Sequence, residues 1–512
     1  MMNHDLSRRD FLKCASILFL SPLLRIVPQP ANTEKPNIIL ILHDALCALN
    51  LSLYDYPRQT SPNLERFSER ATVFHNHHTA GNFTTPSTAS LFTSTYPWTH
   101  RAFNISGLIN PAVAANNLFN ELKGLYHQEV FTQNIYVDML LYQFEKSLGE
   151  HGHLDNYSLA GHTFYNHLFP KDGIWGMKSY DQLLFKREEA HGSLFLSILN
   201  DLGVQFNKNI RAEKNKEMYP LELPRLANTD VYFRMDQVTA GLIQFLDRLS
   251  QPAFVYLHLM PPHAPYTPAR SYMHLFYDGW SPPSKKKHRL APGIPQSRLD
   301  KLRRSYDQFI ANLDAEFGHL MEYLEQSGLM ENSYIIFTSD HGELFERGAH
   351  GHSMPLVFEP NIRVPLLIHA PGQQERQDIH SATSTVDLLP SLLKISGLEV
   401  PAWSEGELLP GFGGEETSQR NIYVIEAKTN PAYSPLRKAT IAMMHGQYKL
   451  IHYIGYRFYR DEYEFYDLQN DPEEIINLYP SHPIAIEMKN ELDRKLVEVN
   501  LPYMKASSNR SH

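Results

Sequence analysis

This chain of 512 residues contains little cysteine and has no excess of positive charge. The sequence contains only two cysteines, Cys14 and Cys47, and the first lies in an N-terminal segment discussed below, so no disulfide framework can be drawn. Lys and Arg total 47 against 56 Asp and Glu, which gives a formal net charge of -9. Because no global basic field exists to collect nucleic acid, we expect no nucleic-acid partner.

Hydrophobic runs long enough to cross a bilayer are lacking as well. The longest apolar stretch near the N-terminus, Cys14 to Leu24, is shorter than the roughly 18 to 20 residues that a spanning helix needs. It follows the segment Ser7 to Lys13, which carries Arg8 and Arg9, and the two together are typical of a twin-arginine export signal. The alternative is a pair of surface arginines ahead of a buried helix.

We therefore predict that residues 1–31 export the folded protein to the periplasm or cell envelope. The stretch Gln29 to Ala31 is a poor cleavage site, so an uncleaved segment that tethers the protein to a membrane stays open as an alternative.

The rest of the chain has the pattern of an α/β protein with two domains. Its length exceeds the roughly 250 to 300 residues at which a single core stops growing. A long amphipathic helix is predicted from Leu302 to Leu324, because its apolar residues recur at helical spacing. Four apolar runs are predicted to be buried strands of a mainly parallel sheet: Asn37 to Leu42, Phe254 to Leu259, Tyr334 to Phe337 and Val364 to His369.

The alternation of strands and helices weakens after Gly397. We predict a catalytic domain over residues 35–400, with its central sheet between helices, and a smaller C-terminal α+β domain over residues 401–505. Short strand-like pieces in the smaller domain include Lys449 to Tyr453 and Glu464 to Leu468. In α/β sheets, ligands bind outside the carboxyl ends of the strands.

Metal-capable side chains follow two of the predicted strands directly. Asp44 follows the first strand, and Asp340 and His341 follow the third. Each alone would be a strand-end cap or a surface charge, but their joint placement at one sheet edge favours a metal site. Carboxylates plus one imidazole suit calcium, magnesium or manganese, and the imidazole keeps zinc open.

A run of small hydroxyl residues, Asn82 to Ser94, opens a further predicted helix. Backbone N-H groups and the dipole at a helix N-terminus favour an approaching anion, and a nearby metal activates a hydroxyl there. Thr84 is therefore a candidate nucleophile. Taken by itself, the segment is better explained as an ordinary helix cap, and it needs the other motifs to indicate an active site.

Together these motifs resemble the sulfatase family of the alkaline phosphatase superfamily. The similarity runs from about Lys35 to Tyr479 and implies an alkaline-phosphatase-like domain plus a smaller C-terminal domain around a short antiparallel sheet. It also implies one divalent metal ion, bound by Asp44, Thr84, Asp340 and His341. The similarity rests on the segments Asn37 to Leu46, Thr60 to Leu64, Thr84 to Ser87, Thr338 to Glu343, Arg363 to Leu366, Val386 to Pro390 and Tyr466 to Leu478.

Three positions depart from that family's pattern. Thr84 stands where sulfatases have the Cys or Ser that is converted to formylglycine, and threonine cannot yield that aldehyde. Thr88 replaces the arginine four residues later, and Ala45 replaces a second metal aspartate. A direct threonine nucleophile is similar to the family's phosphotransferase and phosphodiesterase relatives, in which a metal-bound threonine is transiently phosphorylated.

Several histidines are candidates for acid catalysis or anion binding. The segment Pro261 to Tyr266 resembles the family's His-Xaa-Pro segment, so His263 is the first candidate, and imidazole titrates near neutrality. His350 resembles the family's cationic or imidazole side chain over the substrate, with His352 a weaker candidate. His100 is as well interpreted as an ordinary loop histidine, and the cluster His75, His77 and His78 offers no closed zinc set.

Two further features are expected to be structural. Cys47 is predicted to be a small buried residue. The segment Pro282 to Arg289 carries a charge run and is predicted to be an exposed loop, with a lid over an anionic substrate as the alternative.

Three functional hypotheses remain. The first is a metal-dependent phosphoesterase or phosphotransferase with Thr84 as nucleophile, acting on a small-molecule, lipid or glycan ester. The second is a sulfatase that works without formylglycine. The third is a non-catalytic binding protein on the same fold. The sequence indicates neither the oligomeric state nor the natural substrate.

Overall fold

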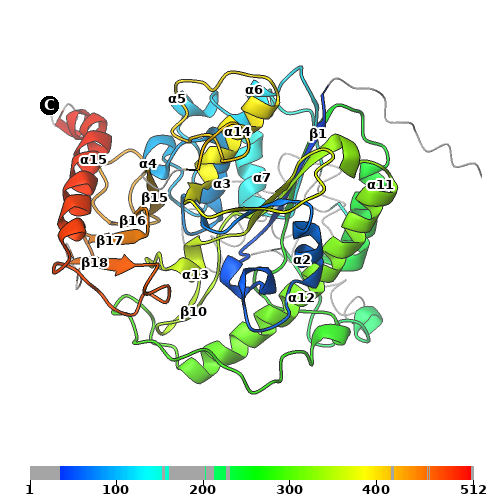
Figure 1. The fold of residues 1–512 in the computed structure, drawn as a ribbon, viewed down its shortest axis with the longest axis horizontal. Coiled ribbons are helices and arrows are strands. Elements are labelled where there is room, and N and C mark those ends of the chain that lie inside the picture. Colours follow the sequence, from blue (N-terminus) through cyan, green and yellow to red (C-terminus); the bar gives the residue numbers. More distant parts are fainter. Residues whose placement is uncertain are drawn as a thin grey trace, which may run out of the picture.

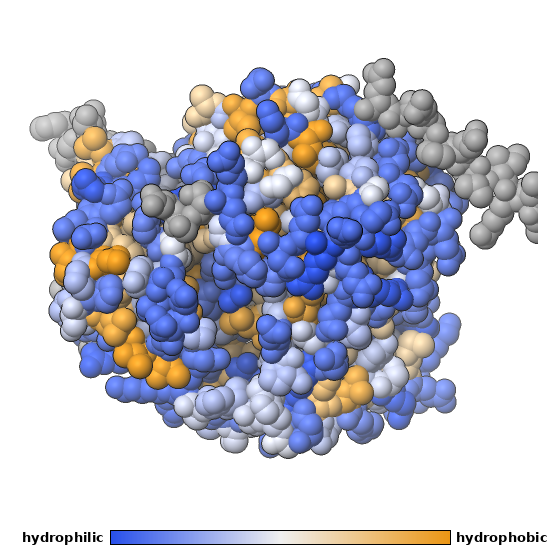
Figure 2. Space-filling view, viewed as in Figure 1, coloured by the Kyte–Doolittle hydropathy of each residue, from blue (hydrophilic) through white to orange (hydrophobic). Residues whose placement is uncertain are grey.

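The computed structural model describes residues 35–152, 156–160, 202, 213–226, 231–416, 420–457, 459 and 462–508. The predicted export signal, residues 1–31, lies outside these ranges. Among the described helices, none has the length and apolar character of a membrane span. Figure 1 shows a large body of helices around a central sheet, with a smaller unit at the left that ends in the C-terminal helix. The face shown in Figure 2 is mainly hydrophilic, with scattered apolar patches.

The central sheet has eight strands, and most of its pairings are parallel. At its centre, β1 (Asn37–His43) runs parallel to both neighbours, β8 (Ala253–Leu259) and β9 (Ser333–Ser339). Only β12 (Leu366–His369) pairs antiparallel, with β9 on one side and β2 on the other. The predicted mainly parallel sheet is confirmed. The full order is β13 (Gln377–Ile379), β2 (Thr72–Phe74), β12, β9, β1, β8, β4 (His127–Thr132) and β5 (Glu150–His151).

Helices cover both faces of this sheet because successive residues of the central strands point to opposite sides. Ile39 and Ile41 of β1 belong to one apolar core, and Ile38, Leu40 and Leu42 belong to another. The first core is covered by α2 (Pro62–Ser68), α11 (Met235–Leu246) and α12 (Gln296–Gln326), and the second by α3 (Thr84–Thr93), α6 (Leu118–Glu121), α7 (Ile135–Gln143) and α14 (Leu388–Ile395). Figure 1 shows the two groups of helices on either side of the sheet.

The smaller unit is an antiparallel sheet with a helix, as predicted for a C-terminal α+β domain. Its strands lie in chain order: β15 (Asn421–Glu426), β16 (Ala439–His445), β17 (Tyr448–Ile454) and β18 (Glu462–Asp467), followed by α15 (Pro483–Ser508). Residues of both units share one apolar core, in which Trp98 and Phe103 contact the cluster formed by Ile425, Ile441 and their neighbours. The two units are therefore packed together.

Short elements connect these layers. They are β3 (His77–His78), α4 (Pro97–His100), α5 (Pro111–Ala114), β6 (Ser158–Ala160), β7 (Tyr232–Phe233), β10 (Leu344–Glu346), β11 (Ala349–Gly351), α13 (Glu359–Ile362), β14 (Thr383–Ser384) and the single 3-10 turns Ala48–Asn50, Ser52–Tyr54, Arg270–Tyr272, Met330–Asn332 and Thr385–Asp387.

The segment Pro282 to Arg289 differs from its prediction as a simple exposed loop. Two of its side chains are mostly buried against neighbouring segments. Lys285 Nζ lies 2.9 Å from Glu346 Oε2, and His288 Nε2 lies 3.4 Å from Glu464 Oε1 of β18. The sequence could not show this, because both partners come from distant parts of the chain. The other charged residues of the segment, Lys286, Lys287 and Arg289, are exposed as predicted.

Candidate active site

Three neighbouring strands place polar side chains at one edge of the sheet. Asp44 follows β1, and Asp340 and His341 follow β9, its parallel neighbour. On the other side of β1, His258 near the end of β8 pairs with Leu42 in register. Because the carboxyl ends of parallel strands meet at one edge, residues more than two hundred positions apart converge there.

The two aspartates are held alike, with one oxygen bonded and one free. Asp44 Oδ2 accepts a hydrogen bond from Asn134 Nδ2 at 2.5 Å, and Asp340 Oδ1 accepts from the Ala45 and His341 amides at 3.1 and 2.9 Å. Their other oxygens, Asp44 Oδ1 and Asp340 Oδ2, are buried and have no hydrogen-bond partner. Unpaired buried carboxylate oxygens are costly unless a cation is bound.

Imidazole nitrogens face the same point. Donor atoms of Asp44, His258 and Asp340 all lie within 4.8 Å of one another. His341 Nδ1 lies 2.9 Å from the carbonyl of Gly342 and donates to it, so Nε2 is the acceptor nitrogen. That Nε2 lies 3.6 Å from Asp44 Oδ1 and 3.4 Å from Asp340 Oδ2.

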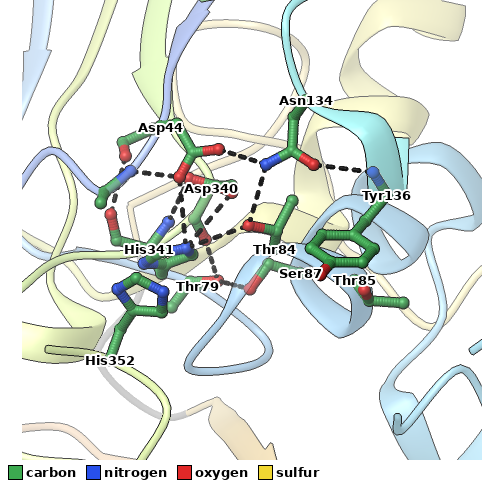
Figure 3. Close-up of polar contacts among 12 residues, drawn as sticks. Asp44, Thr79, Thr84, Thr85, Ser87, Asn134, Tyr136, Asp340, His341 and His352 are labelled. Carbon is green, nitrogen blue, oxygen red and sulfur yellow. Dashed lines mark hydrogen bonds and ion pairs between the residues drawn. The ribbon is translucent and has the colours of Figure 1, made fainter. Parts of the chain in front are cut away.

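Thr84 completes the group from the first residue of α3. Its Oγ1 lies 3.3 Å from His341 Nε2 and 3.5 Å from Asn134 Nδ2. Thr84 is almost fully buried at 5% exposed, and Figure 3 shows its side chain pointing toward Asp44, Asp340 and His341. The structure thus brings together all four residues that the resemblance implied as metal ligands.

The electrostatics of the carboxylates reflect this crowding. Burial raises the pKa of Asp340, and the nearby Asp44 raises it further. Burial also acts to raise the pKa of Asp44, but neighbouring His263 and His258 outweigh it and hold that pKa below its usual range. One pair of close carboxylates therefore has opposite pKa shifts, as expected for groups that share a site.

These donors fit a divalent cation. Two free carboxylate oxygens, one hydroxyl and imidazole nitrogens suit magnesium, calcium or manganese, and the imidazoles also suit zinc. The sequence prediction missed His258, because it lies within an apolar run that is predicted to be a wholly buried strand. The signal that could have indicated it is its place one residue before the end of that strand. It also missed Asn134, which begins α7.

The three candidate histidines after β8 and β9 occupy different positions. His352 packs its ring 4.1 Å from the ring centroid of His341, and His263 lies 5.0 Å from His352. His350 instead directs Nε2 to the Tyr266 hydroxyl at 2.9 Å. Burial lowers the pKa of His352 to about 3 and, less strongly, the pKa of His350. His352, the weaker candidate from sequence, is thus the one in contact with His341.

Glu343 lies beneath these histidines. Its Oε1 is 3.2 Å from His352 Nδ1, and burial raises the pKa of its carboxyl group. The side chain is only 1% exposed. It is a buried acid that contacts the His352 ring through Nδ1, while the ring itself packs against His341.

The remaining candidates take structural positions. His100 contacts Ser90 at 3.0 Å. In the cluster His75, His77 and His78, the rings contact three different residues: Asp378 at 2.6 Å, Thr383 at 3.0 Å and Glu359 at 3.0 Å. Cys47 is fully buried, and burial raises the pKa of its thiol to about 12, which agrees with its predicted structural role.

Comparisons with known proteins give one consistent result. The family model described as Sulfatase matches residues 36–398, and a second, described as N-sulphoglucosamine sulphohydrolase, C-terminal, matches residues 348–501. A choline-sulfatase of Rhizobium meliloti is 24% identical over 87% of this chain and 83% of its own length. An ulvan-active sulfatase of Formosa agariphila is 25% identical over 94% of this chain and 84% of its own length.

Solved structures share the fold at low sequence identity. The phosphonate monoester hydrolase of Agrobacterium radiobacter superposes with a TM-score of 0.61 at 17% identity, over 92% of this chain and 96% of its own. A protein solved in complex with its substrate D-glucosamine-2-N,6-O-disulfate superposes with a TM-score of 0.64 at 17% identity, over 92% and 99%. At these identities the likeness establishes the fold alone.

Proposed function

This chain belongs to the sulfatase family, and from that premise we propose that it cleaves or transfers sulfate or phosphate esters with Thr84 as the nucleophile and one bound divalent cation. The coarser statement, a sulfatase-family hydrolase of ester bonds, follows from membership itself. The nucleophile and the preference for phosphoesters are the proposed part.

One observation carries the proposal: Thr84 Oγ1 lies 3.3 Å from the acceptor nitrogen of His341, and that nitrogen lies 3.6 and 3.4 Å from the two unpaired carboxylate oxygens, Asp44 Oδ1 and Asp340 Oδ2. A divalent cation bound there would supply positive charge for the oxygen that becomes negative during ester cleavage. The residues that would hold it are Asp44, Thr84, Asp340 and His341, with His258 within reach.

The chain's own residues then have assignable roles. The Thr84 hydroxyl loses its proton to water, Oγ1 forms a bond to phosphorus or sulfur, and the bond from that atom to the leaving oxygen breaks. His263 or His350 donates the proton that the leaving oxygen takes up. His352, whose pKa burial lowers to about 3, is neutral and instead packs against the His341 ring. Release of the group to water makes the protein a hydrolase, and release to an acceptor hydroxyl makes it a transferase.

Phosphoester chemistry is favoured because Thr84 cannot become formylglycine. The second candidate function is hydrolysis of sulfate esters without that aldehyde, and the full-length similarity to the choline-sulfatase and the ulvan-active sulfatase favours it. Those names also support small-molecule or glycan esters as the substrate class, and a lipid ester fits the proposed envelope location. The non-catalytic hypothesis has the least support, because the Asp44, Thr84, Asp340 and His341 set is intact.

The place of action is also a proposal. The arginine pair and the short apolar run within residues 1–31 support export through a twin-arginine route to the periplasm or cell envelope, with an uncleaved segment as a membrane tether.

The test is intact-mass analysis of the purified protein, with its metal content measured, after brief incubation with an aryl phosphate, an aryl phosphodiester and an aryl sulfate. We expect an adduct of phosphoryl mass on the Thr84 peptide, absent from Thr84→Ala and present in Thr93→Ala. Thr93 is the matched control because it is also a buried threonine of α3, and its hydroxyl donates to the Ala89 carbonyl and contacts the Thr95 hydroxyl, away from Asp44 and Asp340 in the described contacts. Turnover of the aryl sulfate alone, with no phosphoryl adduct, would favour the second candidate.

A further inference from the structure

Asn134 has a structural task that fixes the orientation of its amide. It lies in the turn between β4 and α7 and is 1% exposed. Its Oδ1 accepts a hydrogen bond from the backbone N-H of Tyr136 at 2.8 Å and so caps the N-terminus of α7. Because Oδ1 must face the helix, Nδ2 must face the opposite way, toward the sheet edge.

The two hydrogens of Nδ2 point toward two different residues of the site, a carboxylate and a hydroxyl. One is donated to Asp44 Oδ2 at 2.5 Å, and the other is directed at Thr84 Oγ1 at 3.5 Å. Figure 3 shows the Asn134 amide nitrogen directed toward Asp44 and Thr84, and its amide oxygen directed toward Tyr136 on the other side. One side chain thus connects a carboxylate to the hydroxyl across the site.

The bond to Asp44 helps to decide which carboxylate oxygen is free, together with His258 Nε2, which lies 3.3 Å from the same Oδ2. With Oδ2 occupied by Asn134, only Oδ1 of Asp44 is left without a partner, on the side of His341. The contact with Thr84 acts on the hydroxyl in a similar way. Since Nδ2 can only donate, the Thr84 hydrogen cannot point toward Asn134, and a lone pair of Oγ1 does.

We propose that Asn134 is a positioning residue that sets the orientations of the Asp44 carboxylate and the Thr84 hydroxyl for attack on the ester. This inference rests on the proposed function, because it assigns Asn134 an effect through Thr84. Side chains that hydrogen-bond to metal ligands without contacting the metal matter in this way. Their removal typically lowers metal affinity or activity by roughly 10- to 100-fold.

Two substitutions separate positioning from simple helix capping. Asp caps a helix as well as Asn does, whereas Ala does not. If Asn134 were only a cap, kcat would follow the order wild type, Asn134→Asp, Asn134→Ala. If it positions the site, Asn134→Asp must be the worse variant, because it places a carboxylate oxygen against Asp44 Oδ2 and removes the donor to Thr84.

We expect kcat to fall in the order wild type, Asn134→Ala, Asn134→Asp, by roughly 10- to 100-fold for Asn134→Ala, with KM changed much less and the rate of adduct formation on Thr84 falling in parallel. Asn117 provides the matched control, because it is also a buried helix cap, with Oδ1 accepting from Asn120 and Nδ2 donating to the Ala114 carbonyl. Asn117→Asp and Asn117→Ala are expected to keep the wild-type kcat. Bound metal and melting temperature are measured for each variant, so that unfolding is recognised directly.

The possible failures are distinguishable. Wild-type kcat in Asn134→Asp, with Thr84→Ala inactive, overturns the positioning role alone. So does the capping order of the two Asn134 variants. Full turnover by Thr84→Ala overturns the proposed nucleophile and the Asn134 inference together.

Discussion

Lys449 Nζ of β17 lies 3.0 Å from Glu359 Oε1 of α13, so a buried ion pair joins the small sheet to the large domain. The Lys449 side chain is 0% exposed, and it also lies 2.7 Å from Glu474 Oε1. Burial acts to lower the pKa of Lys449, but the two glutamates outweigh it and raise that pKa. The raised pKa favours the charged form of Lys449, which is enclosed between the two domains.

We expect Lys449→Met to destabilise the protein by roughly 3 to 5 kcal/mol, because it leaves the carboxylates of Glu359 and Glu474 buried without their cation. The measurement is the free energy of unfolding in urea. Lys495→Met is the control, because Lys495 pairs with Glu498 at the surface and exposed pairs contribute about 0 to 1 kcal/mol. Equal effects of the two substitutions would contradict the assigned role of Lys449.

Acid should destabilise the protein through His100. Burial lowers the pKa of this ring to about 3, and its Nδ1 accepts a hydrogen bond from the Ala102 amide at 3.1 Å, which requires the neutral form. Between pH 6.5 and 3, His100 binds a proton in the unfolded chain but not in the native protein. The free energy of unfolding therefore decreases by about 1.4 kcal/mol for each unit by which the pH is lowered below 6.5. The effect is absent above pH 6.5.

The check is the pH dependence of the unfolding free energy in His100→Asn, whose Oδ1 can still accept from Ala102. Between pH 6 and 4 we expect the unfolding free energy of this variant to change less steeply with pH than that of the wild type. The difference in slope should correspond to roughly one bound proton. His274→Asn, at an exposed histidine, should leave the slope unchanged. A wild-type slope in His100→Asn would show that other groups account for the acid sensitivity.

Removal of the cation should reverse the effect of Asp340→Asn on the stability of the protein. In EDTA we expect Asp340→Asn to be at least as stable as the wild type, because it removes a buried charge that Asp44 opposes. With cation present at 100 times its Kd, the wild type should gain about 2.7 kcal/mol and Asp340→Asn much less. Melting temperatures in EDTA and in magnesium, calcium, manganese or zinc test this.

Asp55→Asn is the control for that experiment. Asp55 is exposed and adopts a left-handed conformation with φ of 65°, which Asn tolerates well. Its response to each cation should equal that of the wild type. A cation response retained in Asp340→Asn would mean that the ion binds elsewhere.

The geometry of the histidines predicts an order of activity. His352 contacts His341 and lies beside His263, whereas His350 is bonded to Tyr266. General acid catalysis contributes typically 10² to 10⁴-fold, so we expect a kcat loss in that range for His263→Asn. Smaller losses are expected for His350→Asn, whose ring is bonded to Tyr266, and for His352→Asn, whose ring is kept neutral by burial. Steady-state kinetics with aryl esters of differing leaving-group pKa provide the measurement. A larger loss in His350→Asn, greatest for the poorest leaving group, would restore His350 as the acid.

Much of the fold could be read from the sequence. Three predicted apolar runs lie within β1, β8 and β9, and the fourth, Val364 to His369, covers β12 but begins two residues before it. The helical spacing from Leu302 to Leu324 lies within α12. These signals are local, because burial on both faces of a strand or on one face of a helix imposes its own period on the chain. The sequence did not indicate which strand of the sheet runs antiparallel. The direction of β12 is decided only by its pairing with β9 and β2.

The site divides in the same way. Asp44, Thr84, Asp340 and His341 carry their signal in neighbouring residues, because each follows a buried strand or begins a helix. The sequence by itself therefore determined the strands, the long helix and the side chains at their ends. Only the tertiary structure decided that His258 and Asn134 join them, that His352 rather than His350 contacts His341, and that Lys285 and His288 are buried. Strand pairing and domain packing bring those residues to partners far away in the chain, and no local period of a sequence encodes which distant segments become neighbours.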